Sequence, residues 1–283
     1  MPTVGEMVAS VAARLAAAGI ENGRLDARLL VGDATGLTAE AMIAAPEAAI
    51  EDPGMVARVE RLTKRRLARE PMSQILGRRE FWSLSFKVTP DVLTPRPDSE
   101  TLVETVLSIV PDRSARLRLL DLGVGSGCLL LSLLHSLPSA RGLGVDRSER
   151  ALTVARANAA ALGLADRAEM RAGDWGADLP DQYDIVVSNP PYIPSDDIEG
   201  LEPEVSEHEP WLALDGGRDG LDAYRTLAGE LPFLVREGGW AALEVGQGQA
   251  PDVARLMRAA GFRIERVAPD LAGIERVILA RRP

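Results

Sequence analysis

Short apolar runs alternate with longer helical patterns through the second part of the chain, and this alternation constrains the fold most. The runs are compact and uninterrupted, as in parallel strands buried on both faces: LRLLDL, GLGVD, YDIVVS and WAALEV. Helical patterns accompany them at residues 127–137, 148–162, 221–235 and 251–260. Two further strands, FRIERVA and RVILA, are joined without a helix, which predicts an antiparallel pair at the sheet edge. We therefore expect an open α/β sheet, mostly parallel, with ligands beyond the carboxyl ends of its strands.

The N-terminal part of the chain has a helical pattern instead. Thr3 and Glu6 have the spacing of a capping box, and Gly36 suits a left-handed helix end. The longest helix is predicted to begin at Asp52 and to run to the residue before Pro71. These features predict a small helical bundle.

A change of period separates the two parts. Trp82, Leu84, Phe86 and Val88 alternate with polar residues, which indicates a hairpin. We predict a helical domain at 1–72 that docks the substrate, a hairpin connector at 73–94 and a catalytic domain at 95–283.

Composition excludes several classes of protein. The 283 residues carry a formal net charge of −10, which disfavours direct binding to nucleic acid or to a membrane surface. The single cysteine and two histidines argue against a metal site. Glu6 and Arg14 interrupt what would be the apolar core of a signal peptide, so we expect a cytoplasmic protein.

The first strand of the sheet ends in a glycine-rich turn, D-L-G-V-G-S-G-C, from Asp121 to Cys128. A dinucleotide fingerprint would place Gly or Ala at Cys128, so the G-x-G-x-G spacing indicates another ligand. Asp146 ends the next strand, where a carboxylate can accept hydrogen bonds from ribose hydroxyls. Asp174 and Trp175 follow the third strand and can contact a purine. Each feature alone has a structural explanation, but together they predict an adenosine site.

Asn189-Pro190-Pro191-Tyr192 follows the fourth strand and predicts an acceptor site for a planar nitrogen. Such a nitrogen is a poor nucleophile until its N–H bonds point at hydrogen-bond acceptors. The Asn189 side-chain oxygen and the Pro190 carbonyl supply two acceptors, proline removes competing donors, and Tyr192 offers a surface for stacking. Methyl transfer would then depend on positioning rather than on a strong base.

The stretch from Pro190 to Gly220 is strongly acidic, with Arg218 as its only Lys or Arg. An acidic stretch next to the acceptor site would repel the phosphodiesters of a nucleic acid. A DNA or RNA amino-group methyltransferase is therefore disfavoured.

On these residues the chain resembles the peptide chain release factor glutamine methyltransferases, the HemK/PrmC family of class I S-adenosylmethionine-dependent methyltransferases. The resemblance includes QILG at 74–77, EFW at 80–82, LTPRPDSE at 93–100, NPPYI at 189–193, and LEVG at 243–246 with Gln249. It implies a Rossmann-like methyltransferase sheet behind a helical domain. The implied reaction moves a methyl group from S-adenosylmethionine to N5 of the Gly-Gly-Gln glutamine of class-1 release factors, in translation termination, leaving S-adenosylhomocysteine.

The resemblance also implies site residues. Cofactor contacts are expected at Gly123, Val124, Gly125, Ser126, Gly127, Asp146, Trp175 and Asn189. The acceptor glutamine is expected against Asn189, Pro190, Pro191 and Tyr192, of which Asn189, Pro190 and Tyr192 are the catalytic candidates. Gln74 and Thr94 depart from the family pattern, away from the predicted chemistry.

Other interpretations remain open at this point. A sister enzyme that modifies a ribosomal-protein glutamine, a nucleic-acid methyltransferase and a non-catalytic release-factor-binding protein all share parts of the pattern. We expect a monomer. Arg58, Arg61, Arg65 and Arg69 share one helix face and form either a docking surface for an acidic partner or a solvated helix face.

Overall fold

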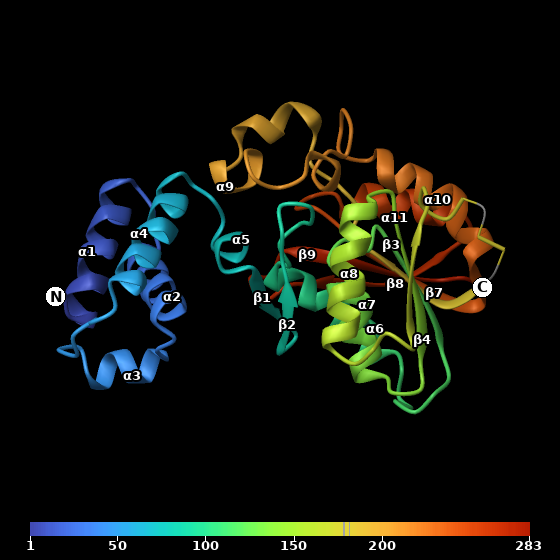
Figure 1. The fold of residues 1–283 in the computed structure, drawn as a ribbon. Helices are drawn as coiled ribbons and strands as arrows, with labels where there is room; N and C mark the ends of the chain where they lie inside the picture. Colours follow the sequence, from blue (N-terminus) through green and yellow to red (C-terminus); the bar gives the residue numbers. More distant parts are fainter. Residues whose placement is uncertain (178, 181) are drawn as a thin grey trace. The chain divides into compact units, whose positions relative to one another are not determined.

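The computed structural model describes residues 1–177, 179–180 and 182–283. Its contacts divide the chain into two compact units, which are residues 1–77 with 202–208, and residues 78–201 with 209–283. Figure 1 shows the first unit as helices and the second as a sheet between helices. In the described part of the chain, no helix has the length and apolar character to cross a membrane.

The first unit is a helical bundle, as predicted. Its helices are α1 (Val4–Ala17), α2 (Gly23–Thr35), α3 (Ala39–Ala44), α4 (Pro53–Leu67), α5 (Met72–Leu76) and α9 (Pro203–Ser206). Thr3 and Glu6 form the expected capping box, with reciprocal hydrogen bonds of 3.2 and 2.8 Å, and Gly36 is left-handed at φ 74°. The longest helix ends earlier than predicted, at Leu67, because Arg69 adopts a left-handed φ of 62° and turns the chain before Pro71.

A segment from far along the chain belongs to this first unit. Glu204, on α9, accepts from Arg66 and from Arg69, each at 2.7 Å. Arg66 is buried and also pairs with Asp26 at 2.7 Å, so this guanidinium lies between two carboxylates. The Gln74 amide donates to the His208 carbonyl at 3.0 Å. A buried arginine needs such partners, and here they fix residues 202–208 against the helices.

The second unit is built on a seven-stranded sheet of order β5-β4-β3-β6-β7-β9-β8. Its strands are β3 (Arg118–Leu122), β4 (Arg141–Asp146), β5 (Ala168–Ala172), β6 (Tyr183–Ser188), β7 (Val235–Glu244), β8 (Arg263–Pro269) and β9 (Glu275–Arg281). Strands β3 to β7 are parallel, whereas β9 is antiparallel to both β7 and β8. The predicted sheet and its antiparallel edge pair are confirmed.

Helices cover both faces of the sheet (Figure 1). The helices are α6 (Glu100–Ser108), α7 (Cys128–Ser136), α8 (Glu149–Ala161), α10 (Asp222–Leu234) and α11 (Ala250–Ala259), with short 3₁₀ turns η1 (Pro97–Ser99), η2 (Ser195–Gly200) and η3 (Trp211–Ala213). Residues of α6, α7 and α8 share one buried cluster, and residues of α10 and α11 share the other. Successive strand residues such as Leu119 and Leu120 enter opposite clusters, because side chains along a strand alternate between its two faces.

The predicted hairpin is formed by β1 (Arg78–Phe81) and β2 (Leu84–Lys87). Trp82 and Ser83 make its turn with φ of 53° and 56°. Phe81 and Phe86 meet edge to face, with ring centroids 6.2 Å apart, inside the α6–α8 cluster. The hairpin therefore packs as part of the second unit.

Candidate functional site

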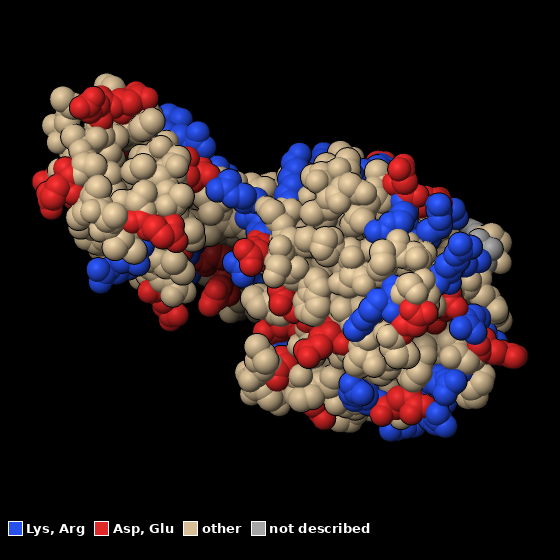
Figure 2. All heavy atoms as spheres, turned by 90° about the horizontal axis from the view of Figure 1, so that it is seen from below, with Lys and Arg blue, Asp and Glu red and all other residues tan. Residues whose placement is uncertain are grey.

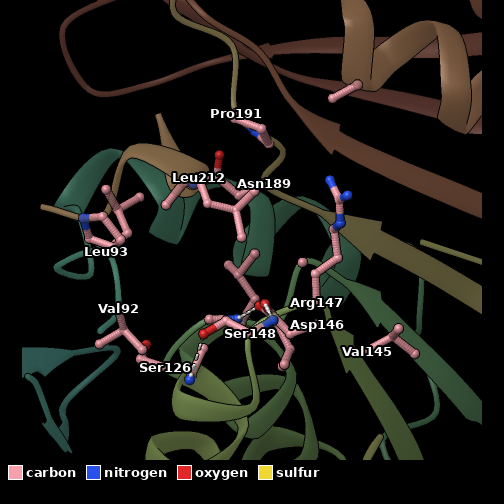
Figure 3. Close-up of a pocket in the computed structure, with 18 of the residues that line it drawn as sticks. Val92, Leu93, Ser126, Val145, Asp146, Arg147, Ser148, Asn189, Pro191 and Leu212 are labelled. Carbon is pink, nitrogen blue, oxygen red and sulfur yellow. Dashed lines mark hydrogen bonds between the residues drawn. The ribbon is translucent and has the colours of Figure 1, made fainter. Parts of the chain in front are cut away.

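One cavity of about 400 Å³ lies at the carboxyl ends of β3, β4 and β6, where the sheet topology predicts a ligand. Figure 3 shows side chains from both predicted ends of the site around it. Its wall contains these predicted residues: Gly123, Val124, Gly125, Ser126, Asp146, Trp175, Asn189 and Pro191. Gly127, Pro190 and Tyr192 are not among the lining residues. The cavity joins the two motifs in one space.

The glycine-rich turn after β3 adopts backbone angles that favour glycine. Gly123, Gly125 and Gly127 have φ of 77°, 53° and 83°, in the left-handed region. Gly127 is the N-cap of α7, and a Cβ there would lie 3.0 Å from the Leu131 side chain. The glycines of the turn therefore leave backbone exposed to the cavity, beside the side chains of Val124 and Ser126.

Asp146 connects this turn to the next strand end. One carboxylate oxygen accepts from the Gly125 N–H and the other from the Ser148 N–H, each at 2.9 Å (Figure 3). The cap of α8 is Ser148, whose hydroxyl accepts from the Ala151 N–H at 3.2 Å. Each carboxylate oxygen keeps accepting capacity, so Asp146 can still hold a hydroxyl at the cavity wall.

Asp121 is buried at the end of β3 and has an unsatisfied oxygen. Its Oδ2 accepts from the Leu130 N–H at 3.3 Å, whereas Oδ1 has no hydrogen-bond partner among the described residues. Burial raises the pKa of this carboxyl to about 7. A positively charged ligand group near the turn would stabilise the ionised form. This observation fits a sulfonium with an amino-acid tail better than a pyrophosphate.

Trp175 lies beside the glycine turn. A Cβ on Gly123 would be 3.7 Å from its ring, and the residue holds a left-handed φ of 51°. The following N–H, of Gly176, donates to Glu230 at 2.7 Å. Asp174 instead pairs with Arg147 at 3.3 Å and is absent from the cavity wall. The indole, rather than the neighbouring carboxylate, is therefore positioned for a planar ligand.

Asn189 reaches the cavity from the end of β6, and its Nδ2 donates to Ser99 Oγ at 3.3 Å. Pro191 also lines the cavity (Figure 3), whereas Pro190 is buried. Tyr192 packs partly buried against the α10–α11 cluster, where burial raises the pKa of its phenol to about 12. The roles of Pro190 and Tyr192 at the acceptor stay predictions.

The backbone of this loop is held by contacts that sequence reasoning missed. The Gln249 amide donates to the Tyr192 carbonyl at 2.9 Å and to the Gly220 carbonyl at 3.2 Å. A Cβ on Gly220 would lie 2.3 Å from the Tyr192 carbonyl oxygen, so only glycine fits there. Gln249 stands out in the sequence only as part of a motif, without a role.

Glu244 and Ser99 are the other residues that sequence reasoning left without a role. Glu244 ends β7 and is only 2% exposed, and the nearby side chains of Asn189 and Ser99 stabilise its ionised form. Burial raises the pKa of this carboxyl to about 7. A signal was present in the sequence, because Glu244 is the one charged residue of the apolar run WAALEV.

Ion pairs modify the charge arguments made from the sequence. In the acidic stretch, Glu204 pairs with Arg66, Glu209 with Arg96 and Asp219 with Arg225. The acidic stretch thus carries less unpaired negative charge than its composition indicates.

Three of the four arginines predicted to share one helix face are paired in the same way, and Arg69 lies beyond the end of α4. Arg58 pairs with Asp33, Arg65 with Glu70, and Arg69 with Glu204. Figure 2 shows charges of both signs intermixed on the visible face. Ion pairs within the chain thus explain three of the four arginines, and no other protein is needed to account for them.

The described residues contain no group of three or more His, Cys, Asp and Glu side chains that could hold a metal ion. The cavity wall combines the backbone of the glycine turn and apolar side chains with polar groups that include Arg96, Ser99, Asp146 and Asn189.

Comparison with known proteins first defines the class. The methyltransferase small domain matches residues 97–200. The structure of the T. thermophilus 16S rRNA N2 G1207 methyltransferase RsmC, solved with AdoMet and guanosine, has a TM-score of 0.52 at 19% identity, covering 73% of this chain and 50% of that one. The second unit therefore has the fold of a methyltransferase, and the predicted fold class is confirmed.

The family follows from closer relatives. The PrmC N-terminal domain matches residues 6–77. A release factor glutamine methyltransferase of Rhodospirillum rubrum is 48% identical over 99% of this chain and 85% of its own length. That of Bradyrhizobium diazoefficiens is 45% identical over 99% and 97%. The chain belongs to the release factor glutamine methyltransferase family, as its motifs predicted.

Proposed function

We propose that this chain transfers a methyl group from S-adenosylmethionine to the side-chain amide nitrogen of the Gly-Gly-Gln glutamine in a class-1 peptide chain release factor. The observation that carries the proposal is the 48% identity, over nearly the whole chain, to a relative named release factor glutamine methyltransferase. The cavity supports it, because the glycine turn and Asn189 line the same space.

The cofactor end would be formed by Gly123 to Gly127, Asp146 and Trp175. Bound S-adenosylmethionine would supply a methyl group on a positively charged sulfur, and S-adenosylhomocysteine would be the product. The backbone of the turn would approach the ligand closely, Asp146 would accept from its ribose hydroxyls, and the Trp175 indole would cover its purine. The buried Asp121 carboxylate would attract its positive charge.

The acceptor end would orient the glutamine amide. Asn189 Oδ1 and the Pro190 carbonyl would accept its two hydrogens, which draws the nitrogen lone pair out of conjugation, while Pro191 and Tyr192 would confine the glutamine. The N–C bond would form as the S–C bond breaks, and the amide would release one proton to water. Orientation of this kind contributes up to about 7–11 kcal/mol in well-aligned reactions.

The partner would be the release factor itself, with no direct contact to nucleic acid. The N-terminal helices would serve docking indirectly, because the ion pairs of Glu204 hold part of the loop that follows Tyr192. A monomer acting in the cytoplasm, without a metal, is sufficient for this chemistry.

The test is transfer of labelled methyl from S-adenosylmethionine to a purified class-1 release factor. A matched factor with its Gly-Gly-Gln glutamine replaced is the control, and duplex DNA, ribosomal RNA and ribosomal proteins are parallel substrates. Label on the intact factor alone is expected. Label on RNA or on a ribosomal protein instead would contradict the proposed substrate, and no label on any of them would favour a non-catalytic binding protein.

A further inference from the structure

Glu244 lies behind the acceptor end of the cavity, outside its wall. It ends β7, is 2% exposed, and its Oε2 has no hydrogen-bond partner among the described residues. The side chains of Ser99 and Asn189 lie close enough to this carboxyl to stabilise its ionised form. Ser99 and Asn189, in turn, both line the cavity. Glu244 is thus connected to the acceptor site through two cavity residues.

The donors and acceptors in this group determine how the Asn189 amide faces. An Asn side chain has two N–H donors and one carbonyl oxygen. Nδ2 of Asn189 donates to Ser99 Oγ at 3.3 Å, and the same amide stabilises ionised Glu244, which favours its second N–H group pointing at the carboxylate. An ionised carboxylate can only accept, so it requires N–H and O–H groups to point at it. With both N–H groups engaged, Oδ1 is the atom left for a substrate amide.

Protonation of Glu244 would remove this constraint. A protonated carboxyl can donate to Ser99 or to Asn189 Oδ1, which permits the flipped amide with NH₂ toward the substrate. In this flipped orientation the NH₂ group of Asn189 would face the N–H groups of the substrate amide, so that two donors would face each other. The acceptor site would then lose one of its two acceptors.

Several groups around Glu244 determine its charge. Arg276 on β9 favours the ionised form, but it is shared with Asp270 at 2.9 Å and Asp98 at 3.4 Å. Asp98 on η1 disfavours the ionised form. The remaining titratable groups that face Glu244 are the Tyr192 and Tyr224 phenols and the Cys128 thiol, each with a pKa raised by burial. Burial dominates, and it raises the pKa of Glu244 to about 7.

We propose that Glu244 is a positioning residue which, when ionised, holds the Asn189 amide with Oδ1 toward the glutamine, directly and through Ser99. The proposal depends on the methyl transfer proposed above. It makes that transfer sensitive to pH near neutrality, because protonation of Glu244 releases the amide. Activity therefore falls as the pH decreases through the pKa of Glu244.

The experiment compares wild type with Glu244→Gln in single-turnover methyl transfer to a release factor between pH 6 and 8.5. At saturating S-adenosylmethionine, whose positive charge keeps Asp121 ionised, wild type should lose activity on the acidic side following one ionisation. The Gln variant should be about tenfold slower at pH 8 and should lack this acidic limb, since it does not ionise. Its affinity for S-adenosylmethionine, measured by calorimetry, should stay within about twofold of wild type.

A second variant covers the case in which Glu244→Gln does not fold. Ser99→Ala removes the hydroxyl link and should lower the turnover rate and weaken the acidic limb, again without loss of cofactor affinity. Ser132→Ala is its matched control, because Ser132 is another fully buried serine, on α7, whose hydroxyl has no hydrogen-bond partner among the described residues. It should leave both rate and pH profile unchanged.

The outcomes separate the two proposals. An inactive wild type overturns the proposed function, and this inference with it. An active wild type with a flat profile, or a Glu244→Gln enzyme that keeps both the rate and the acidic limb, overturns the positioning role alone. Equal losses for Ser99→Ala and Ser132→Ala would show a packing effect and would also overturn it.

Discussion

The two ends of the cavity are built in different ways. At the cofactor end, the turn follows β3 and Asp146 is the last residue of the neighbouring strand β4, and the two are joined by the Gly125–Asp146 hydrogen bond. At the acceptor end, Asn189 depends on Ser99 and Glu244, which lie far from it in the chain. The cofactor end is therefore formed by the ends of neighbouring strands, whereas the acceptor end is formed by segments that are far apart in the sequence.

This difference has a mechanistic meaning. A cofactor site must mainly bind, and backbone turns with one carboxylate suffice for that. An acceptor site must orient one amide group, which requires side chains whose own hydrogen bonds are fixed. Variants at the two ends should therefore separate binding from turnover.

The largest effect is expected for Asn189→Ala. It removes an acceptor aimed at the reacting amide, so turnover should fall about 10²–10³-fold. Affinity for S-adenosylmethionine should change far less, because Asn189 is only one of the eight predicted cofactor contacts. Single-turnover rates and calorimetry on the same preparation measure both; a loss confined to cofactor affinity would break the proposed division between the ends.

Asp146→Ala should have the opposite signature. It removes the carboxylate that accepts from Gly125 and Ser148, which loosens the turn and deletes the predicted ribose contact. Affinity for S-adenosylmethionine should fall about 10- to 100-fold, while turnover at saturating cofactor stays close to wild type. A change in turnover with unaltered affinity would argue against this assignment.

Gly220→Ala tests the long-range support of the acceptor loop. The added Cβ would lie 2.3 Å from the Tyr192 carbonyl oxygen, at a φ of 73°. Gly163→Ala is a matched control, because Gly163 has a similar φ of 69° with nothing within 4 Å of the added Cβ. The control should cost about 1–2 kcal/mol of folding stability for its backbone alone. Gly220→Ala should cost more and also slow methyl transfer, and equal effects in both variants would show that the clash is relieved.

The smallest effect concerns stability and pH. Burial raises the pKa of Glu244 from 4.5 to about 7, so the folded chain binds this proton more tightly than the unfolded chain. The stability that the proton confers is complete below about pH 4.5 and is lost as the pH rises through 7. The Tm of Glu244→Gln minus that of wild type should therefore rise by a few degrees as the pH is raised from 5.5 to 8.

A partly exposed carboxylate, that of Glu60, supplies the contrast for this last measurement. Hydrogen bonding to Arg14 lowers the pKa of Glu60, so Glu60→Gln should show the same Tm difference from wild type throughout this range. A Glu244→Gln difference that is equally flat would mean that Glu244 is already ionised at pH 5.5.

Sequence patterns predicted much of this fold because they encode local rules. The apolar runs gave the strands, the spacing of Thr3 and Glu6 gave a helix start, and Gly36 gave a helix end. The end of α4 was predicted wrongly, because the left-handed turn at Arg69 has no Gly or Asn to signal it. The docking function of the helical domain remains a prediction.

The sequence by itself determined the order of strands and helices, the glycine turn and the Asn-Pro-Pro-Tyr segment, since these depend on periodicity and backbone preference. Only the tertiary structure decided that Glu244 lies behind Asn189, that Glu204 joins the helical unit, and that several carboxylates of the acidic stretch are paired. The physical reason is that burial and charge pairing depend on which distant segments pack together. The same carboxyl group is an ordinary acid in water and a pH-sensitive positioning group inside this fold.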